Sequence, residues 1–138
     1  MSEPFRHRVR VRFNECDPQG VLFYANYLVY FDVLMTELWR AAFKGGYTEL
    51  VASGTDAVVA EATIRYRASA RFDDEVDLVA QVVRLGTTSS VTGVRAERVR
   101  GGELLAEGEL RHVFLDPDTL EKKEIPDDVR AGLGKFAA

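Results

Sequence analysis

The chain has 138 residues, a formal net charge of −4 and a composition that is 46% hydrophobic and 29% charged, as in ordinary globular proteins. The mildly acidic balance gives no reason to expect nucleic acid as a partner. A single cysteine excludes a disulfide within the chain and suits a reducing compartment. The first residues contain no apolar run of the kind that would predict a signal peptide. The apolar-rich residues 21–43 are interrupted by polar ones such as Asp32 and Arg40, so we predict no membrane span. We therefore expect one cytoplasmic domain, residues 1–138.

The first predicted element is a strand over residues 7–13, where the side chains alternate strictly in polarity. One face carries His7, Val9, Val11 and Phe13, and the other carries Arg8, Arg10 and Arg12. A period of two predicts a half-buried strand. No aromatic residues lie between the arginines, so we interpret them as a solvated sheet face rather than as a nucleic-acid-binding stripe.

Residues 24–42 change to helical spacing. Apolar side chains recur every three or four residues, at Tyr24, Tyr27, Leu28, Phe31, Leu34, Met35, Leu38, Trp39 and Ala42. We expect Gly45 and Gly46 to end this helix with a left-handed cap. The helix has about five turns, and its apolar stripe is wide enough to pack against a sheet over most of its length.

Four further strands are predicted by alternating segments that turn residues separate, at 58–67, 76–82, 89–99 and 103–115. Glycine-containing turns at 86–88 and 100–102 indicate antiparallel hairpins, and Pro126 opens a short C-terminal helix from its first position. The order predicts an α+β fold, a curled five-stranded antiparallel sheet wrapped around one long central helix. Such a sheet leaves strand edges uncovered, so we expect the chain to associate.

The segment between the first strand and the helix concentrates the chemically useful residues. Asp17, followed by Pro18 and Gly20, comes just before the helix N-terminus. Free backbone N–H groups and the positive end of the helix dipole lie there, and both suit an oxyanion. A carboxylate beside such donors can attack a bound carbonyl or activate water to attack it. The alternative interpretation is structural, because an Asp before Pro commonly forms an Asx-turn and an acid near a helix start is stabilising.

Residues 13–31, FNECDPQGVLFYANYLVYF, resemble the signature of the 4-hydroxybenzoyl-CoA thioesterase family of hotdog proteins, which includes the thioesterases encoded with the Tol–Pal system. Residues 66–74, YRASARFDD, are similar to the second landmark of that family. The resemblance implies a hotdog fold that hydrolyses acyl-CoA or aryl-CoA thioesters to free acid and CoA, without a metal or other cofactor. It also implies homodimers that join two sheets into one, with active sites at the interface, and often homotetramers.

The resemblance implies two catalytic residues. Asp17 would be the catalytic carboxylate, as nucleophile or as general base, and the backbone N–H of Tyr24 would polarise the thioester carbonyl. Gly20 would let the loop approach the substrate closely. The Tol–Pal type usually carries His at position 24, whereas the aromatic residue here resembles the hydroxybenzoyl-CoA branch and favours aryl substrates.

Three further residues are expected to bind substrate. Tyr27, near the start of the helix, is a candidate for the acyl pocket. Arg67 and Arg71 lie in the second landmark and are the favoured candidates for the phosphates of CoA, because guanidinium groups pair well with phosphate.

Other kinds of site lack their residues. One cysteine and two separated histidines make no metal-binding set, Cys16 has no neighbouring base, and neither Gly-x-Ser-x-Gly nor a glycine-rich phosphate loop occurs. Two alternatives stay open, a thioesterase that acts on acyl carrier protein and a non-catalytic acyl-CoA-binding protein. A binding protein has no need for a desolvated carboxylate, which favours the enzyme.

Overall fold

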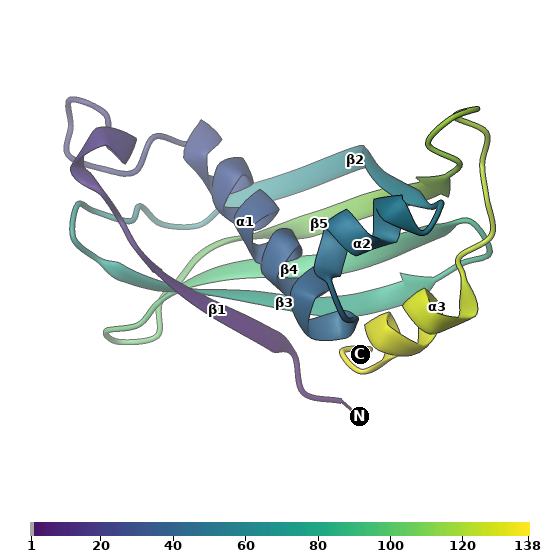
Figure 1. Cartoon of the computed structure of the whole chain (residues 1–138). Coiled ribbons are helices and arrows are strands. Elements are labelled where there is room, and N and C mark those ends of the chain that lie inside the picture. The colour runs from purple at the N-terminus through teal and green to yellow at the C-terminus, as the bar shows by residue number, and fades with distance from the viewer. Residues whose placement is uncertain (1) are drawn as a thin grey trace.

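The computed structural model describes residues 2–138, and in them a five-stranded sheet is combined with three α-helices and one short 3₁₀ helix (Figure 1). The strands are β1 (Phe5–Arg10), β2 (Asp56–Tyr66), β3 (Glu75–Leu85), β4 (Ser89–Arg98) and β5 (Leu104–Leu115). The helices are η1 (Phe13–Glu15, 3₁₀), α1 (Ala25–Ala42), α2 (Gly46–Ala52) and α3 (Asp127–Gly134).

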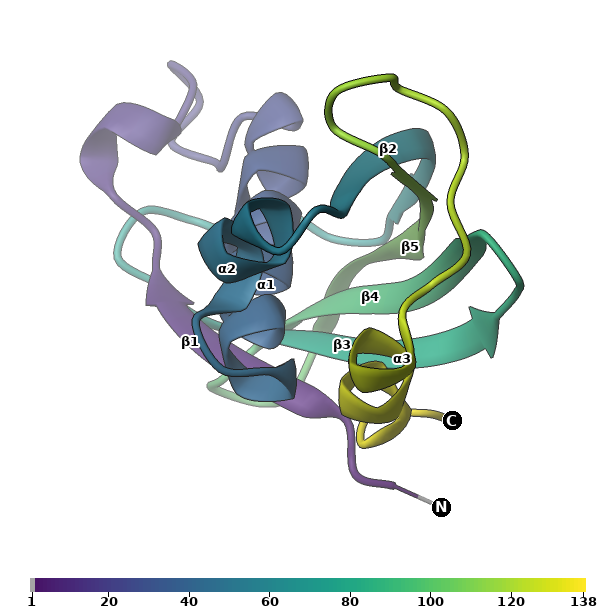
Figure 2. The same cartoon turned by 45° about the vertical axis from the view of Figure 1, so that its right-hand side comes forward.

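The sheet is antiparallel throughout, with the strand order β1-β3-β4-β5-β2. The hairpins β3–β4 and β4–β5 form at the two predicted glycine turns, whereas β1 and β2 are the edge strands. The segment from β2 to β3 must therefore cross from one edge of the sheet to the strand beside the other edge. Figure 2 shows the sheet curving around α1, so the predicted α+β arrangement of a curled five-stranded antiparallel sheet is confirmed.

The core lies between the apolar stripe of α1 and the inner face of the sheet. Phe31, Leu34 and Leu38 of α1 are completely buried, as are Leu78 and Ala80, which lie on one face of β3. The apolar stripe of α1 thus packs against the inner side chains of β3. This packing stabilises both elements at the positions that their sequence periods predict.

The first strand is shorter than predicted. It ends at Arg10, and Phe13 begins η1 with 79% of its surface exposed, so the prediction of a strand through Phe13 is wrong. The side chain of Glu15 turns the chain here by accepting hydrogen bonds from the backbone N–H of Arg12 at 2.8 Å and from its guanidinium at 3.0 Å. The alternation of side chains favours a strand that continues to Phe13, but this capping interaction is more favourable. It satisfies the backbone N–H of Arg12, which a continued edge strand would leave unpaired.

The long helix does not end at the predicted cap. Phe43 is already extended and terminates α1, while Gly45, with φ of 86°, is the N-cap of the additional helix α2. Of the α-helices in residues 2–138, α1 and the short C-terminal helix α3 were predicted, whereas α2 was not. Pro126 does open α3, from the N-cap rather than from the first helical position.

The arginines of β1 point to the outer face of the sheet and are paired with carboxylates. Arg8 donates to Asp77 at 2.8 Å, and Arg6 pairs with Glu97 at 3.3 Å. About half of each arginine side chain remains exposed, so these ion pairs add little to the free energy of unfolding. None of the helices found between residues 2 and 138 is long and apolar enough to cross a membrane.

A buried histidine predicts how stability depends on pH. His112 of β5 is 4% exposed, packs edge-on against Trp39 at 5.6 Å, and has no partner for Nδ1 in the described residues. Burial lowers the pKa of His112 to about 4, and the charge of Asp32 opposes this only in part. The unfolded chain therefore binds the proton more readily, and we expect the free energy of unfolding to fall by up to about 3 kcal/mol as the pH drops from 6.5 to about 4.

Denaturant unfolding at pH 7, 5.5 and 4.5 tests this expectation. His112→Phe keeps a ring against Trp39 and should remove this part of the acid sensitivity. His7→Gln, at the other histidine, should retain it. An unchanged slope of stability against pH in His112→Phe would show that His112 does not carry the effect.

Candidate active site

Asp17 lies in a tight turn between η1 and α1. Its backbone N–H donates to the carbonyl of Val21 at 2.9 Å, and the N–H of Gly20 returns to the carbonyl of Asp17 at 2.9 Å. Gly20 has φ of 78°, a conformation that side chains disfavour, so glycine is required for this turn. An isolated bridge between Cys16 and Leu22 extends the turn into a short hairpin.

Asp17 is half-buried, and one of its carboxylate oxygens already accepts a hydrogen bond. Oδ1 accepts the N–H of Gln19 at 2.9 Å. This hydrogen bond forms the Asx-turn that the alternative, structural interpretation of Asp17 predicts. Oδ2 makes no hydrogen bond within residues 2–138. The Asx-turn therefore does not exclude a chemical role, because it orients the carboxylate and leaves its second oxygen available.

The start of α1 offers unpaired donors. Tyr24 is the N-cap, and its backbone N–H and that of Ala25 find no acceptor among the described residues. The Tyr24 ring is largely exposed and lies edge-on to Tyr66 at 6.1 Å. Unpaired N–H groups at the positive end of an 18-residue helix are suited to an anionic oxygen.

Glu15, which is not among the predicted site residues, joins the Asp17 turn to α1. Its carbonyl accepts the N–H of Phe23 at 3.0 Å and Nδ2 of Asn26 at 2.8 Å. Its carboxylate accepts the hydroxyl of Tyr30 at 2.7 Å. Burial raises the pKa of Glu15, but the hydrogen bonds from Arg12 and Tyr30 outweigh burial and lower it overall. The spacing of Asn26 and Tyr30, four residues apart on one helix face, was the available signal.

The second landmark lies beside the same turn. The N–H of Leu22 donates to the carbonyl of Ala70 at 2.8 Å, Val21 forms a bridge with Arg71, and the N–H of Phe72 donates to the carbonyl of Gly20 at 3.4 Å. Two segments about fifty residues apart in sequence are thus joined through their backbones. They enclose a hollow of about 340 Å³ lined by Phe13, Cys16, Asp17, Pro18, Gly20 and Phe72.

Tyr27 is buried beneath this second landmark rather than open to the surface. Its hydroxyl donates to the carbonyl of Ala68 at 3.4 Å and accepts the N–H of Ala70 at 3.1 Å. Burial raises the pKa of the Tyr27 phenol. The Tyr27 hydroxyl is therefore hydrogen-bonded within the chain. Through Ala68 and Ala70 it holds the second landmark, which contacts the Asp17 turn.

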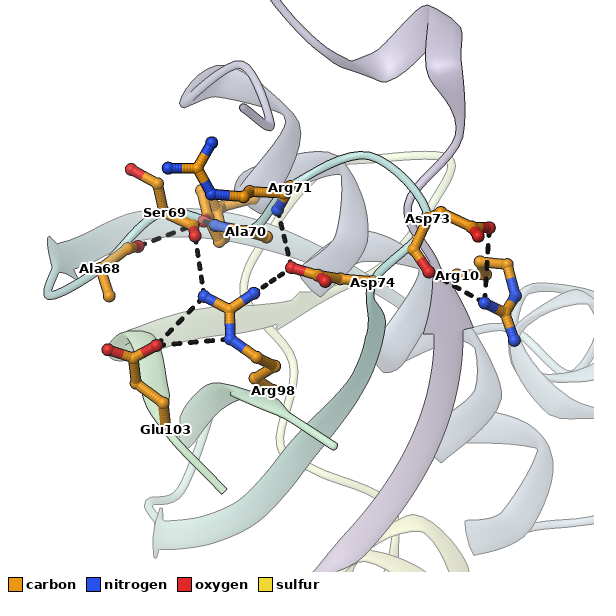
Figure 3. Close-up of polar contacts among 10 residues, drawn as sticks. Arg10, Ala68, Ser69, Ala70, Arg71, Asp73, Asp74, Arg98 and Glu103 are labelled. Carbon is orange, nitrogen blue, oxygen red and sulfur yellow. Dashed lines mark hydrogen bonds and ion pairs between the residues drawn. The ribbon is translucent and has the colours of Figure 1, made fainter. Parts of the chain in front are cut away.

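The two candidate arginines differ in their surroundings. Nε of Arg67 donates to Glu107 at 3.0 Å on the outer surface. Arg71 is exposed and beside the Asp17 turn, and no partner for its guanidinium occurs in the described part of the chain; Figure 3 shows this group directed away from Asp74. The structure therefore brings Asp17, Gly20 and Arg71 together and engages Arg67 elsewhere.

An apolar groove begins at the same end of α1. It has a volume of about 410 Å³ and runs between α1 and strands β2 and β5, lined by Ala25, Leu28, Val29, Asp32, Met35, Val59, Ala62, Leu110 and His112. The helix rises 1.5 Å per residue, so the groove follows α1 for about 15 Å from Ala25 to Met35. Within residues 2–138, no cluster of His, Cys, Asp and Glu could hold a metal ion.

Comparisons with known proteins agree with this geometry. The family model described as thioesterase superfamily matches residues 19–105. The acyl-CoA thioester hydrolase YbgC of Escherichia coli is 30% identical over 129 residues, which cover 92% of this chain and 93% of that protein.

Solved structures share the fold. The 1,4-dihydroxy-2-naphthoyl-CoA thioesterase Slr0204 from Synechocystis superposes with a TM-score of 0.88 at 13% identity, covering 96% of this chain and 97% of that one. The dynemicin thioesterase superposes with a TM-score of 0.89 at 24% identity, covering 99% of both chains. The hotdog fold implied by residues 13–31 and 66–74 is in agreement with both likenesses. Because the family model spans more than half of the chain and YbgC aligns with nearly all of it, this chain belongs to the thioesterase superfamily.

Proposed function

We propose that this thioester hydrolase cleaves acyl-CoA or aryl-CoA thioesters to the free acid and CoA, with Asp17 and the first N–H groups of α1 as its machinery. The observation that carries the proposal is the hairpin that folds the Asp17 turn back beside a helix start whose donors are unpaired. The name of the relative YbgC supports CoA as the thiol carrier.

The helix start would act on the carbonyl oxygen. A thioester carbonyl that accepts the N–H of Tyr24 is polarised, and the negative charge that develops on its oxygen is stabilised by this donor and by the helix dipole. The donor is a backbone group, so the Tyr24 side chain is not needed for this step. Its exposed ring, which lies edge-on to Tyr66, is proposed to line the entrance to the apolar groove that begins at Ala25.

Asp17 would act on the carbonyl carbon through its free Oδ2. In the nucleophilic route, this oxygen bonds to the carbon, the C–S bond breaks, CoA leaves as the thiolate, and water hydrolyses the resulting anhydride. In the general-base route, the same oxygen takes a proton from a water molecule as that water attacks the carbon; the C–S bond then breaks, and the proton passes to the CoA thiolate that leaves. The hydrogen bond from Gln19 to Oδ1 holds the carboxylate in one orientation for either route.

The two ends of the substrate would lie on opposite sides of this centre. The acyl or aryl group is proposed to enter the apolar groove that begins at Ala25, next to the polarising N–H. The phosphates of CoA are proposed to meet Arg71, whose guanidinium no carboxylate neutralises in the described residues. Arg67 remains a second phosphate ligand in this proposal, although it would have to leave Glu107.

We also propose that two copies of the chain associate through β2. This strand is at the sheet edge, and Val58 and Val59 on it, together with Leu28 and Val29 of α1, are substantially exposed. An unpaired edge beside an apolar surface favours pairing with a second sheet. A homodimer built in this way, or a homotetramer of such dimers, would place the groove near the interface.

Asp17→Asn tests the catalytic proposal. The amide is nearly isosteric and still accepts the N–H of Gln19, so folding should be retained. It neither attacks nor takes a proton, so kcat/KM should fall by roughly 10²–10⁴-fold. Release of free thiol would be followed with a panel of CoA esters from acetyl to palmitoyl, together with benzoyl and phenylacetyl, and with matching acyl carrier protein esters.

Asp116→Asn is the matched control. Asp116 also precedes a proline, and its Oδ1 accepts the N–H groups of Asp118 and Thr119, but it lies after β5 rather than before α1. Its replacement should leave kcat/KM unchanged. Wild-type turnover by Asp17→Asn would remove Asp17 from the mechanism, and a wild-type protein inert toward every thioester would overturn the reaction itself.

Arg71→Met tests the CoA phosphate site. Removing the exposed cation that faces the phosphate should raise KM for a CoA ester roughly 10–100-fold, since charge-assisted hydrogen bonds contribute roughly 1.5–3 kcal/mol, and should change kcat little. The KM for a short thiol ester of the same acyl group, which has no phosphates, should stay the same. Arg100→Met, at another exposed arginine, is the control. Equal effects on both esters would argue against phosphate binding.

A further inference from the structure

The segment from Arg67 to Asp74, which we term the 67–74 loop, determines where the Asp17 turn lies. It crosses from β2 to β3 and makes backbone contacts with Gly20, Val21 and Leu22 on its way. Gly20 and Val21 are also the residues that hydrogen-bond to the backbone of Asp17. A displacement of the 67–74 loop would therefore move the Asp17 carboxylate with it.

Arg98 holds both ends of this loop. It is the last residue of β4, and only 19% of its side chain is exposed. Nη2 donates to the carbonyl of Ser69 at 2.9 Å, while Nη1 pairs with the carboxylate of Asp74 (Figure 3). The same oxygen of Asp74 accepts the N–H of Arg71 at 2.8 Å, so the ion pair also closes the loop on itself.

The guanidinium is held in turn by Glu103. Nε and Nη2 of Arg98 donate to Oε1 of Glu103 at 3.3 and 3.1 Å, across the β4–β5 turn (Figure 3). Three acceptors thus converge on one planar group, two from the 67–74 loop and one from the β4–β5 turn. Only arginine presents enough donors in a fixed fork for this, because the ammonium of lysine is a compact point charge.

We propose that Arg98 is a positioning residue that sets the Asp17 carboxylate by anchoring the 67–74 loop. The inference rests on the proposed catalytic role of Asp17. It does not extend to the start of α1, because Phe23 and Asn26 are hydrogen-bonded to Glu15 independently of the loop. Arg98 touches neither substrate nor reacting atoms and acts only through the loop and the turn.

The nearby Arg95 provides a contrast on the same strand. Its Nε donates to Glu97 at 3.1 Å, so this pair joins two side chains of β4 and holds no loop. Removing it should alter a surface ion pair and nothing at the Asp17 turn. Arg95→Met is therefore the matched control for Arg98→Met, which keeps the aliphatic stem and removes every donor.

The test is a double-mutant cycle with Asp17→Asn, measured as thioester hydrolysis at a temperature where near-UV circular dichroism shows all variants folded. Because a misplacement of about 1 Å can cost about 10²-fold, Arg98→Met should lower kcat by roughly 10–100-fold with little change in KM. Arg98→Lys should recover part of this loss, and Arg95→Met should match the wild type. In the Asp17→Asn background, Arg98→Met should cost less than about twofold more, since no carboxylate remains to be positioned.

Hydrogen exchange supplies a second readout that is independent of turnover. The amide of Leu22, which donates to Ala70, should exchange faster in Arg98→Met than in Arg95→Met. Wild-type kcat in Arg98→Met, or the same fold-loss with and without Asp17, would overturn the inference and leave the proposed function intact. Full activity of Asp17→Asn would overturn both.

Discussion

The candidate site depends on one constraint, that the first N–H groups of α1 stay unpaired while the chain before them is held in place. The N–H groups of Asn26 and Tyr27 donate to the carbonyls of Phe23 and Tyr24, so the donors without a partner in residues 2–138 are those of Tyr24 and Ala25. The helix start is held by the carbonyl of Glu15, which accepts the N–H of Phe23 and the side-chain amide of Asn26. The helix start is thus positioned without being capped, and it keeps its capacity to bind a negatively charged oxygen.

The second part of this constraint, that the chain before α1 is held in place, is met by the topology of the sheet. The order β1-β3-β4-β5-β2 forces the connection after β2 to cross the sheet, and this crossing carries residues 70–72 past the Asp17 turn. Two side chains from other elements then hold the crossing, Tyr27 from α1 and Arg98 from β4. The turn is a local structure, but its place in the molecule is decided by elements that are distant in sequence.

Several polar groups are buried for this arrangement, at a cost in desolvation. The carboxylate of Glu15 is compensated by Arg12 and Tyr30, and the Tyr27 hydroxyl by backbone groups of the 67–74 loop. His112 is the exception, because its Nδ1 has no partner in residues 2–138. The compensated groups lie near the Asp17 turn, whereas the uncompensated one lines the apolar groove.

The sequence by itself determined the features that depend on neighbouring residues. The periods of α1 and β3, the glycine turns and the placing of Asp17 before a helix all follow from local rules, as does the signature in residues 13–31. The end of β1 at Arg10 and the helix α2 were mispredicted, because a capping carboxylate and a left-handed glycine outweigh patterns of polarity. Only the tertiary structure decided that Tyr27 and Arg98 hold the 67–74 loop. Both contacts join residues far apart in the chain, and neither side chain has a local pattern that announces its partner.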